Sequence, residues 1–154
     1  MTAPPTLYEW AGGLPALERL TERFYARVAL DPLLAPVFAH MDGEHPRHVA
    51  YFLAEVLRGP TLYTEQRGGH ATMLAHHLQK HLTAAQRTRW VALLLECADE
   101  VALPDDPEFR SAFVSYLEWG SRLALLNSQD GAAPVLEQPM PKWGWGEVGG
   151  PYTG

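Results

Sequence analysis

Hydrophobic side chains recur every three to four residues along most of the chain, which is the spacing of an α-helix with one buried face. The first such stretch covers residues 15–29 and ends before Asp31-Pro32, because the residue before a proline is pushed out of the helical region. The second covers residues 45–57 and is closed by Gly59-Pro60. Each stretch predicts an amphipathic helix.

Two longer amphipathic helices are predicted in the second half of the chain. Thr83 and Gln86 have the spacing of a capping box, and the helix that they start continues to about residue 101. Residues 103–107 interrupt the pattern, and a last helix runs from there to about residue 127. Because no stretch alternates with a period of two for long enough to form a strand, the predicted fold class is all-α.

Shorter segments join these helices. Residues 33–38 form an apolar connector, and residues 61–69 are predicted to be a loop that ends in two glycines. A short helix that contains His76 and His77 is predicted to follow this loop. The helical spacing of hydrophobic residues is therefore weakest in the segment between the second and third long helices.

Proline and glycine dominate residues 128–154, which predicts an extended tail after a helical domain of residues 1–127. Trp143 and Trp145 stand out in this tail, because large aromatic side chains are seldom left in solvent. We expect both to pack on the chain's own helices. Contact with a second copy in a homodimer is the alternative.

Composition narrows the functional classes. A chain of 154 residues, with 47% hydrophobic and 19% charged residues, fits one soluble globular domain. The formal net charge of −6 argues against nucleic acid as a partner, since phosphate binding requires a basic surface. No apolar run approaches the roughly 20 residues of a membrane span, and no export signal is visible. With Cys97 as the single cysteine, these features predict a cytoplasmic protein without a membrane partner.

Histidines supply the candidate chemistry. Five of the seven fall in two segments that would face each other across a helical pocket, namely His45, His48, His70, His76 and His77. His77 shares the apolar face of its predicted helix with Met73 and Leu74, four and three residues earlier. An imidazole on such a face needs a partner, and iron is one such partner.

Zinc is the alternative metal. His77 and His81 are four residues apart, the spacing that a helix uses to chelate zinc, which would suit a zinc-dependent helical hydrolase. The segment lacks the glutamate of a zinc-protease helix, and the chain has no cysteine cluster. A zinc enzyme would be colourless and would give no role to Tyr25 or Trp90.

Several segments follow one another in a characteristic order. They are Tyr8-Glu9-Trp10-Ala11-Gly12-Gly13, Arg23-Phe24-Tyr25, residues 31–38, Phe52-Leu53, Gly59-Pro60, Tyr63-Thr64-Glu65, Gly69-His70, His77 and Arg89-Trp90. This ordered set resembles group II of the truncated haemoglobins, globins with a two-over-two helical sandwich that encloses haem. The resemblance covers about residues 8–127, and residues 141–146 also resemble tails of some members.

The resemblance implies haem b as the cofactor and His77 as the proximal ligand of its iron. Tyr25 and Trp90 match the distal tyrosine and the tryptophan of the group, and His45 matches a distal position that varies within it. A phenol, an indole and an imidazole are all hydrogen-bond donors to a ligand with partial negative charge, each contributing about 1–3 kcal/mol. His45 could also act as a gate or as a sixth iron ligand.

Other positions imply contacts with the haem itself. Phe38 matches the aromatic residue that packs on the haem face, Val49 matches a second variable distal position, and Phe52 lies one turn deeper. The chain departs from the family where arginines usually help to neutralise the haem propionates, since Thr72, Leu74 and His76 stand there. Arg58 replaces a usual glycine, and one glycine of Gly68-Gly69 is inserted. The candidate propionate partners are Tyr63, His70, His76 and Lys80.

The resemblance implies reversible binding of dioxygen, and also of nitric oxide, carbon monoxide or peroxide. Three donors around the ligand would slow its release, which suits redox chemistry with an external reductase better than bulk oxygen storage. That chemistry would be like that of a nitric oxide dioxygenase or a peroxidase. A carrier or sensor that binds the ligand without turnover is the alternative on the same haem.

Overall fold

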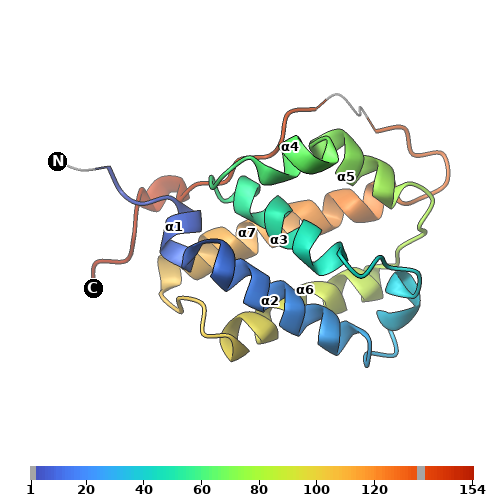
Figure 1. Ribbon diagram of the computed structural model, residues 1–154, viewed down its shortest axis with the longest axis horizontal. Helices are drawn as coiled ribbons and strands as arrows, with labels where there is room; N and C mark the ends of the chain where they lie inside the picture. The colour runs from blue at the N-terminus through green and yellow to red at the C-terminus, as the bar shows by residue number, and fades with distance from the viewer. Residues whose placement is uncertain (1–2, 135–137) are drawn as a thin grey trace.

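The computed structural model describes residues 3–134 and 138–154, and within these ranges it contains helices and no strands. The α-helices are α1 (Leu7–Ala11), α2 (Gly13–Val28), α3 (His45–Val56), α4 (Leu62–Arg67), α5 (His70–His77), α6 (Ala84–Glu100) and α7 (Pro107–Asn127) (Figure 1). Two short 3-10 helices, η1 (Ala35–Phe38) and η2 (Gly146–Val148), complete the set. The predicted all-α fold class is confirmed.

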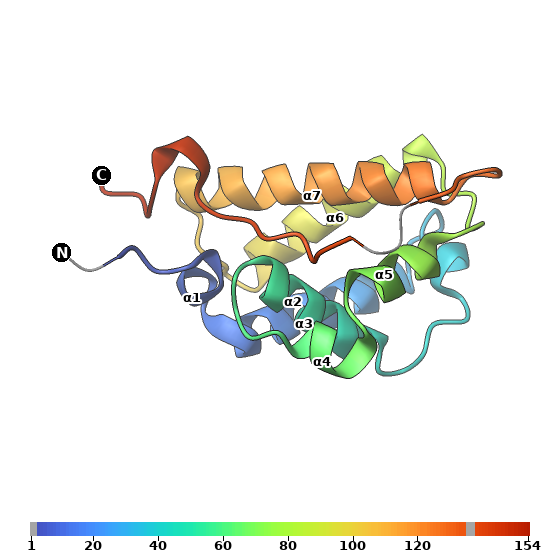
Figure 2. The ribbon, with the colours of Figure 1, turned by 90° about the horizontal axis from the view of Figure 1, so that it is seen from above.

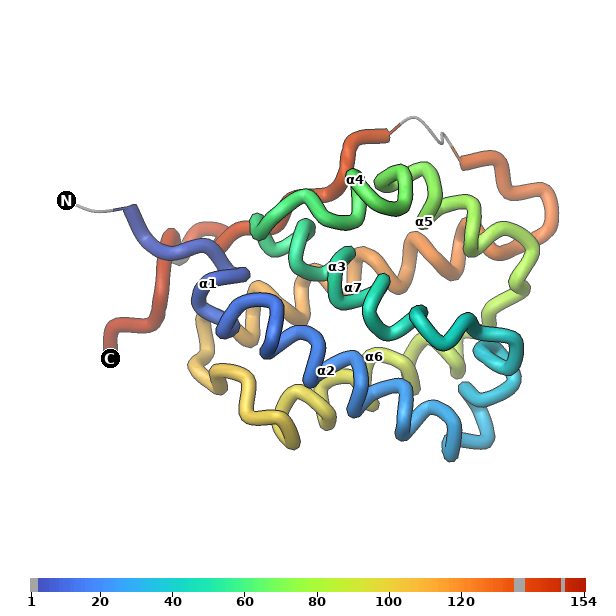
Figure 3. The backbone as a smooth tube through the Cα atoms, in the orientation of Figure 1, coloured from blue at the N-terminus to red at the C-terminus, as the bar shows by residue number. Residues whose placement is uncertain are grey.

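The long helices form two layers. In one layer α2 packs on α3, and in the other α6 packs on α7 (Figure 2). The short helices α4 and α5 continue from α3, with α4 against α3 and α5 against α7 (Figure 3). The helix α4 is thus placed on the first layer, and α5 contacts the second.

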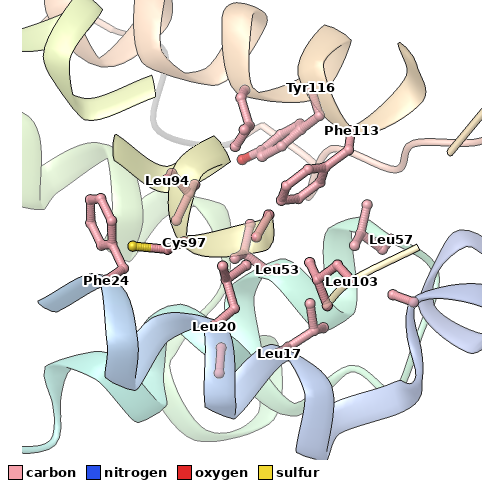
Figure 4. Close-up of a cluster of buried hydrophobic side chains, with 14 of the residues drawn as sticks. Leu17, Leu20, Phe24, Leu53, Leu57, Leu94, Cys97, Leu103, Phe113 and Tyr116 are labelled. Atoms are coloured by element: carbon pink, nitrogen blue, oxygen red, sulfur yellow. The ribbon is translucent and has the colours of Figure 1, made fainter. Parts of the chain in front are cut away.

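The hydrophobic core lies between the two layers, and burial of its side chains stabilises their packing. Leu17, Leu20 and Phe24 on α2 point toward Leu94 and Cys97 on α6 (Figure 4). These side chains are fully or almost fully buried, and burying each large apolar one stabilises the fold by about 1.5–3 kcal/mol. Their three- and four-residue spacing is the pattern from which the sequence predicts α2 and α6.

The start of α6 confirms the predicted capping box. Thr83 Oγ1 accepts a hydrogen bond from the Gln86 backbone N–H at 3.1 Å, and the Gln86 side-chain oxygen accepts one from Thr83 N–H at 2.9 Å. Asp106 caps α7 in a similar way by accepting from Phe109 N–H at 2.8 Å. Both caps satisfy backbone donors that have no partner within a helix.

Three short segments differ from the sequence prediction. Residues 61–69, predicted as a loop, contain α4, and residues 33–38 contain η1. The helix predicted from residue 15 already begins at Gly13, and α1 precedes it without a prediction. The helix α4 has one buried side chain, Tyr63, so no periodic pattern marks it.

The described part of the tail packs on the chain itself, as predicted for both tryptophans. The backbone N–H of Trp143 donates to the Val56 carbonyl at 2.8 Å, and the ring centres of Trp143 and Tyr116 on α7 are 5.3 Å apart. Trp145 Nε1 donates to the Pro5 carbonyl at 2.8 Å. The tail therefore connects α3, α7 and the N-terminal segment.

Asp31 fixes the end of α2 to α6. Its Oδ2 accepts from Arg89 Nε at 2.7 Å, and its Oδ1 accepts from the backbone N–H groups of Leu33 and Leu34 at 3.0 and 3.1 Å. The Arg89 hydrogen bond is the largest effect and, with the two backbone donors, holds the pKa of Asp31 below its ordinary value of 3.8. The ionised carboxylate is therefore favoured by folding.

This depressed pKa predicts an acid-dependent loss of stability. The contribution of Asp31 is complete well above pH 3.8 and is lost as the pH falls through the lower value of the folded state. Asp31→Asn should reduce the decline in the free energy of unfolding between pH 7 and pH 3, measured by urea unfolding. Asp105→Asn, at an exposed carboxylate, is the control and should keep the wild-type decline. Equal declines for all three proteins would contradict this role of Asp31.

Candidate functional site

Three aromatic side chains from three elements meet on one side of the candidate site. The ring centre of Tyr25 on α2 lies 5.4 Å from that of Phe38 in η1 and 5.0 Å from that of His45 on α3. Tyr25 Oη and His45 Nε2 are 3.1 Å apart, within hydrogen-bond distance. The structure thus brings together three residues that the sequence assigns to the same site.

Burial keeps the Tyr25–His45 pair uncharged at neutral pH. It raises the pKa of the Tyr25 phenol well above its ordinary value. Burial is also the largest effect on His45 and, with the nearby His76 and His48, lowers its pKa to about 4. The pair therefore carries one O–H and one imidazole N–H. With that imidazole proton on Nε2, His45 donates to Tyr25 and leaves the phenolic O–H free for a ligand.

Trp90 joins this cluster from α6. Its ring packs edge to face on Phe24 with centres 5.8 Å apart, and Phe24 packs on Tyr25 at 4.9 Å. Trp10 and Trp145 donate their indole N–H groups to protein acceptors, whereas no acceptor for Trp90 occurs within the described residues. The indole N–H of Trp90 is therefore available to a bound molecule.

His77 is the last residue of α5. Burial of its ring, followed by the charges of His76 and Lys80, lowers the pKa of His77 to about 4. The charge of His45 lowers this pKa further, and the backbone carbonyl of Met73 has a smaller effect in the opposite direction. A neutral imidazole can offer a ring nitrogen to iron.

Apolar side chains fill the depth of the site. Phe52 on α3 packs edge to face on Tyr63 of α4 with ring centres 5.1 Å apart, and both are buried. Val49, one turn earlier on α3, is half-buried against the same core. The sequence assigns Phe52 and Val49 to the surroundings of the haem and Tyr63 to its propionates, whereas Tyr63 packs on Phe52 in the structure.

A recess of about 340 Å³ opens beside the Tyr25–His45 pair. Its lining is mostly small and apolar, formed by Tyr25, Val28, Ala29, Ala35, Phe38, Ala39 and Met41. Such a lining offers few hydrogen bonds to a polar substrate and is suited to a small apolar molecule. The recess is therefore compatible with access of a diatomic gas to Tyr25.

His48, Arg67 and His76 form a basic edge of the site. The sequence alone did not predict a role for Arg67. The charge of Arg67 on α4 is the largest effect after burial that lowers the pKa of His48 on α3 and of His76 on α5. The charge of Arg67 therefore acts on residues of two other helices. The signal in the sequence was a lone arginine directly before Gly68, close to the histidine-rich segment.

Two polar atoms near this edge are buried without a partner. They are Arg67 Nε and His70 Nδ1, and His70 is only 7% exposed. An unsatisfied buried polar atom costs about 1–3 kcal/mol, so native folds rarely leave one without a reason. Within the described residues no carboxylate pairs with Arg67. Within the described residues, Arg67 Nε and His70 Nδ1 are thus left for a polar group other than these side chains.

The zinc alternative fails on geometry. The helix α5 ends at His77, and both Gln79 and His81 adopt left-handed backbone conformations, with φ of 58° and 53°. His77 and His81 therefore do not share a helix, and His81 Nε2 lies 2.6 Å from Asp130 Oδ1. In the part of the chain that the structure describes, no group of three or more His, Cys, Asp or Glu side chains could hold a metal ion.

The sequence and the fold are similar to those of known globins. The sequence model of the bacterial-like globin family matches residues 6–118. A group 2 truncated hemoglobin of Bacillus subtilis (strain 168) is 36% identical over 110 residues, which covers 71% of this chain and 81% of the relative. The chain belongs to the group II truncated haemoglobins.

Solved structures of truncated haemoglobins share its fold. The group II truncated hemoglobin from Bacillus anthracis is similar with a TM-score of 0.73 and 28% identity, covering 86% of this chain and 100% of that one. The truncated oxygen-avid haemoglobin from Bacillus subtilis gives a TM-score of 0.70 and 33% identity, covering 79% and 99%. The predicted two-over-two helical sandwich is confirmed.

Membership of this family makes haem, usually haem b, the cofactor and small diatomic molecules the class of ligand. The residues present fit this cofactor. Burial favours the neutral imidazole of His77, which can bind iron, and Arg67 Nε and His70 Nδ1, which have no partner among the described residues, suit the acidic propionates. No helix in the described ranges is both long and apolar enough to cross a membrane.

Proposed function

We propose that this truncated haemoglobin binds dioxygen, with His77 as the proximal iron ligand and Tyr25, His45 and Trp90 around the bound gas. The main support is the Tyr25–His45 pair, whose Oη and Nε2 atoms lie 3.1 Å apart. The relative from Bacillus subtilis that is described as oxygen-avid supports dioxygen as the ligand.

The distal side chains supply the selectivity. When bound, haem provides an iron atom with a sixth position open to a diatomic molecule. Tyr25 Oη and Trp90 Nε1 donate hydrogen bonds to a ligand that carries partial negative charge, and His45 Nε2 donates to Tyr25. Each hydrogen bond to a charged acceptor contributes about 1.5–3 kcal/mol. Dioxygen gains from both donors, whereas the less polar carbon monoxide gains less.

Slow release favours consumption of the ligand over storage. Two direct donors and a supporting imidazole retain dioxygen strongly, and we propose redox chemistry with dioxygen, nitric oxide or peroxide as the use of this retention. The chain's own thiol, Cys97, is buried in the core away from the site. The electrons therefore come from an external reductase.

Absorption spectroscopy of the purified protein tests this function. A Soret band that shifts when carbon monoxide is added to the reduced protein is the expected result, followed by a stable spectrum in air. A spectrum typical of two axial histidines before any gas is added would make His45 an iron ligand instead of a donor. No Soret band after addition of haem would contradict the proposed function.

We also propose that the basic edge binds the haem propionates. Arg67, His48 and His76 bring positive or protonatable groups from three helices to one place, and the buried Nδ1 of His70 lacks a partner. Arg67 then replaces the arginines that the family usually carries in the segment before the proximal histidine. Tyr63 is almost fully buried, so its role is packing on Phe52 more than contact with an acid group.

Arg67→Met should accelerate haem loss by about tenfold, because a charge-assisted hydrogen bond of about 1.5–3 kcal/mol is removed. The measurement is the rate of haem transfer to excess apomyoglobin. The same variant loaded with haem dimethyl ester, which has no propionate charge, should lose its cofactor at the wild-type rate. Arg47→Met, at an exposed arginine of α3, is the matched control. An equal effect of Arg67→Met on both cofactors would contradict a propionate contact.

A further inference from the structure

The C-terminal segment, residues 138–154, is attached to the end of α3. The backbone N–H of Trp143 donates to the Val56 carbonyl at 2.8 Å, and Arg58 Nε donates to the Trp143 carbonyl at 3.2 Å. Arg58 adopts φ of 71°, a left-handed conformation that favours glycine. The arginine that departs from the family pattern thus has a contact here that a glycine could not make. From Trp143 the segment continues to η2 and ends on the α1 side of the molecule (Figure 2).

Lys142 reaches from this segment into the fold. Its Nζ lies 3.3 Å from the Glu55 backbone carbonyl and 3.6 Å from Glu55 Oε2. The Glu55 side chain is only 2% exposed, whereas that of Lys142 is 36% exposed. A buried carboxylate is costly unless a cation and hydrogen bonds compensate it. Within the described residues, Lys142 is the cation that pairs with Glu55.

The other contacts of Glu55 hold α4 in place. Its Oε1 accepts from the Thr64 backbone N–H at 2.8 Å, and its Oε2 accepts from the Thr64 hydroxyl. Thr64 directly follows Tyr63, which packs on Phe52, and Arg67 lies at the end of the same short helix. A six-residue helix is not stable alone, so its position depends on such contacts.

We propose that Lys142 is a positioning residue for the haem site, acting through Glu55 and Thr64 on α4. The inference rests on the proposed function, because Arg67 on α4 is there assigned to the haem propionates. Without the ammonium group, the Glu55 carboxylate is buried with no counter-charge, and water that enters to hydrate it competes with Thr64. Loss of the two Thr64 hydrogen bonds releases α4, and with it the propionate partner.

Haem transfer and hydrogen exchange on the full-length holoprotein test this role. Lys142→Met should raise the rate of haem transfer to apomyoglobin by about tenfold and speed exchange of the peptide that contains Thr64. Lys142→Arg should restore both, since it keeps the charge, and Lys142→Gln should repeat the loss with a polar side chain. Arg122→Met, which removes an exposed cation from α7, should leave both rates unchanged.

A double-mutant cycle separates this role from a general effect on stability. Glu55→Gln removes the charge but keeps an oxygen that can accept from Thr64. In this background Lys142→Met should change haem transfer by less than about twofold, because no buried charge remains to be balanced. Equal effects of Lys142→Met in both backgrounds, or unchanged exchange at Thr64, would overturn the proposal.

The outcomes also distinguish this inference from the proposed function. If the wild-type chain takes up no haem, the proposed function fails, and exchange of the Thr64 peptide still tests the link from Lys142 to α4. If the wild type retains haem and Lys142→Met behaves like it in both assays, the function stands and the role of Lys142 fails.

Discussion

Replacing His77 by alanine is expected to abolish stable haem binding. Burial at the end of α5 favours the neutral form of this imidazole, which is the form that binds iron. Changes in groups that only support a metal ligand reduce metal affinity by about 10- to 100-fold, so loss of the ligand itself should cost more. The measurement is the haem content of the purified variant from its Soret absorbance.

Two control variants make this test specific. His77→Gly should regain haem when free imidazole is supplied, because the small ligand can occupy the space of the missing ring. His76→Ala removes the neighbouring imidazole and should keep a full complement of haem, with faster loss as the only change. Full haem content in His77→Ala, or loss of haem in His76→Ala alone, would move the proximal role to another histidine.

Tyr25→Phe and Trp90→Leu are each expected to raise the dioxygen dissociation rate tenfold or more. One lost hydrogen bond of about 1.4 kcal/mol corresponds to a factor of ten. Tyr25→Phe should have the larger effect, because it also removes the group on which His45 acts at 3.1 Å. Stopped-flow displacement of dioxygen by carbon monoxide measures the rate.

The control for these variants lies outside the site. Trp119→Leu replaces an exposed tryptophan of α7 and should leave the dioxygen dissociation rate unchanged. Carbon monoxide, which is less polar, should respond less than dioxygen to both distal variants. Dissociation rates that stay at the wild-type value in Tyr25→Phe and Trp90→Leu would remove the donors from the proposed function.

The long helices could be predicted from the sequence because burial imposes a period on them. The Thr83–Gln86 box and the proline after Asp31 marked their ends through local chemistry that needs no tertiary contact. The helix α4 could not be predicted, since it has six residues and depends on Glu55, nine positions away. Elements held by distant side chains leave little local pattern.

The candidate site also has parts that the sequence predicts and parts that depend on contacts between distant residues. The residue types at Tyr25, His77 and Trp90 suggested haem because their order resembles a family. The pairing of Tyr25 with His45 depends on the angle between α2 and α3, which the sequence does not encode locally. Lys142 and Glu55 are 87 residues apart, so only the folded chain shows that they meet.

The N-terminal and C-terminal segments run beside each other. A Cβ atom placed on Gly150 would lie 3.4 Å from Pro4 Cβ, and the Trp145 indole N–H donates a hydrogen bond to the Pro5 carbonyl. The described part of the N-terminal segment, from residue 3, and the C-terminal segment both lie on the α1 side of the molecule (Figure 1). A short peptide that joined the ends would close the backbone into a ring without crossing the site. Such a cyclic chain would lose less conformational entropy when the segment with Lys142 docks. Because the segment would have no free end, it should detach less readily on heating and resist digestion from its terminus.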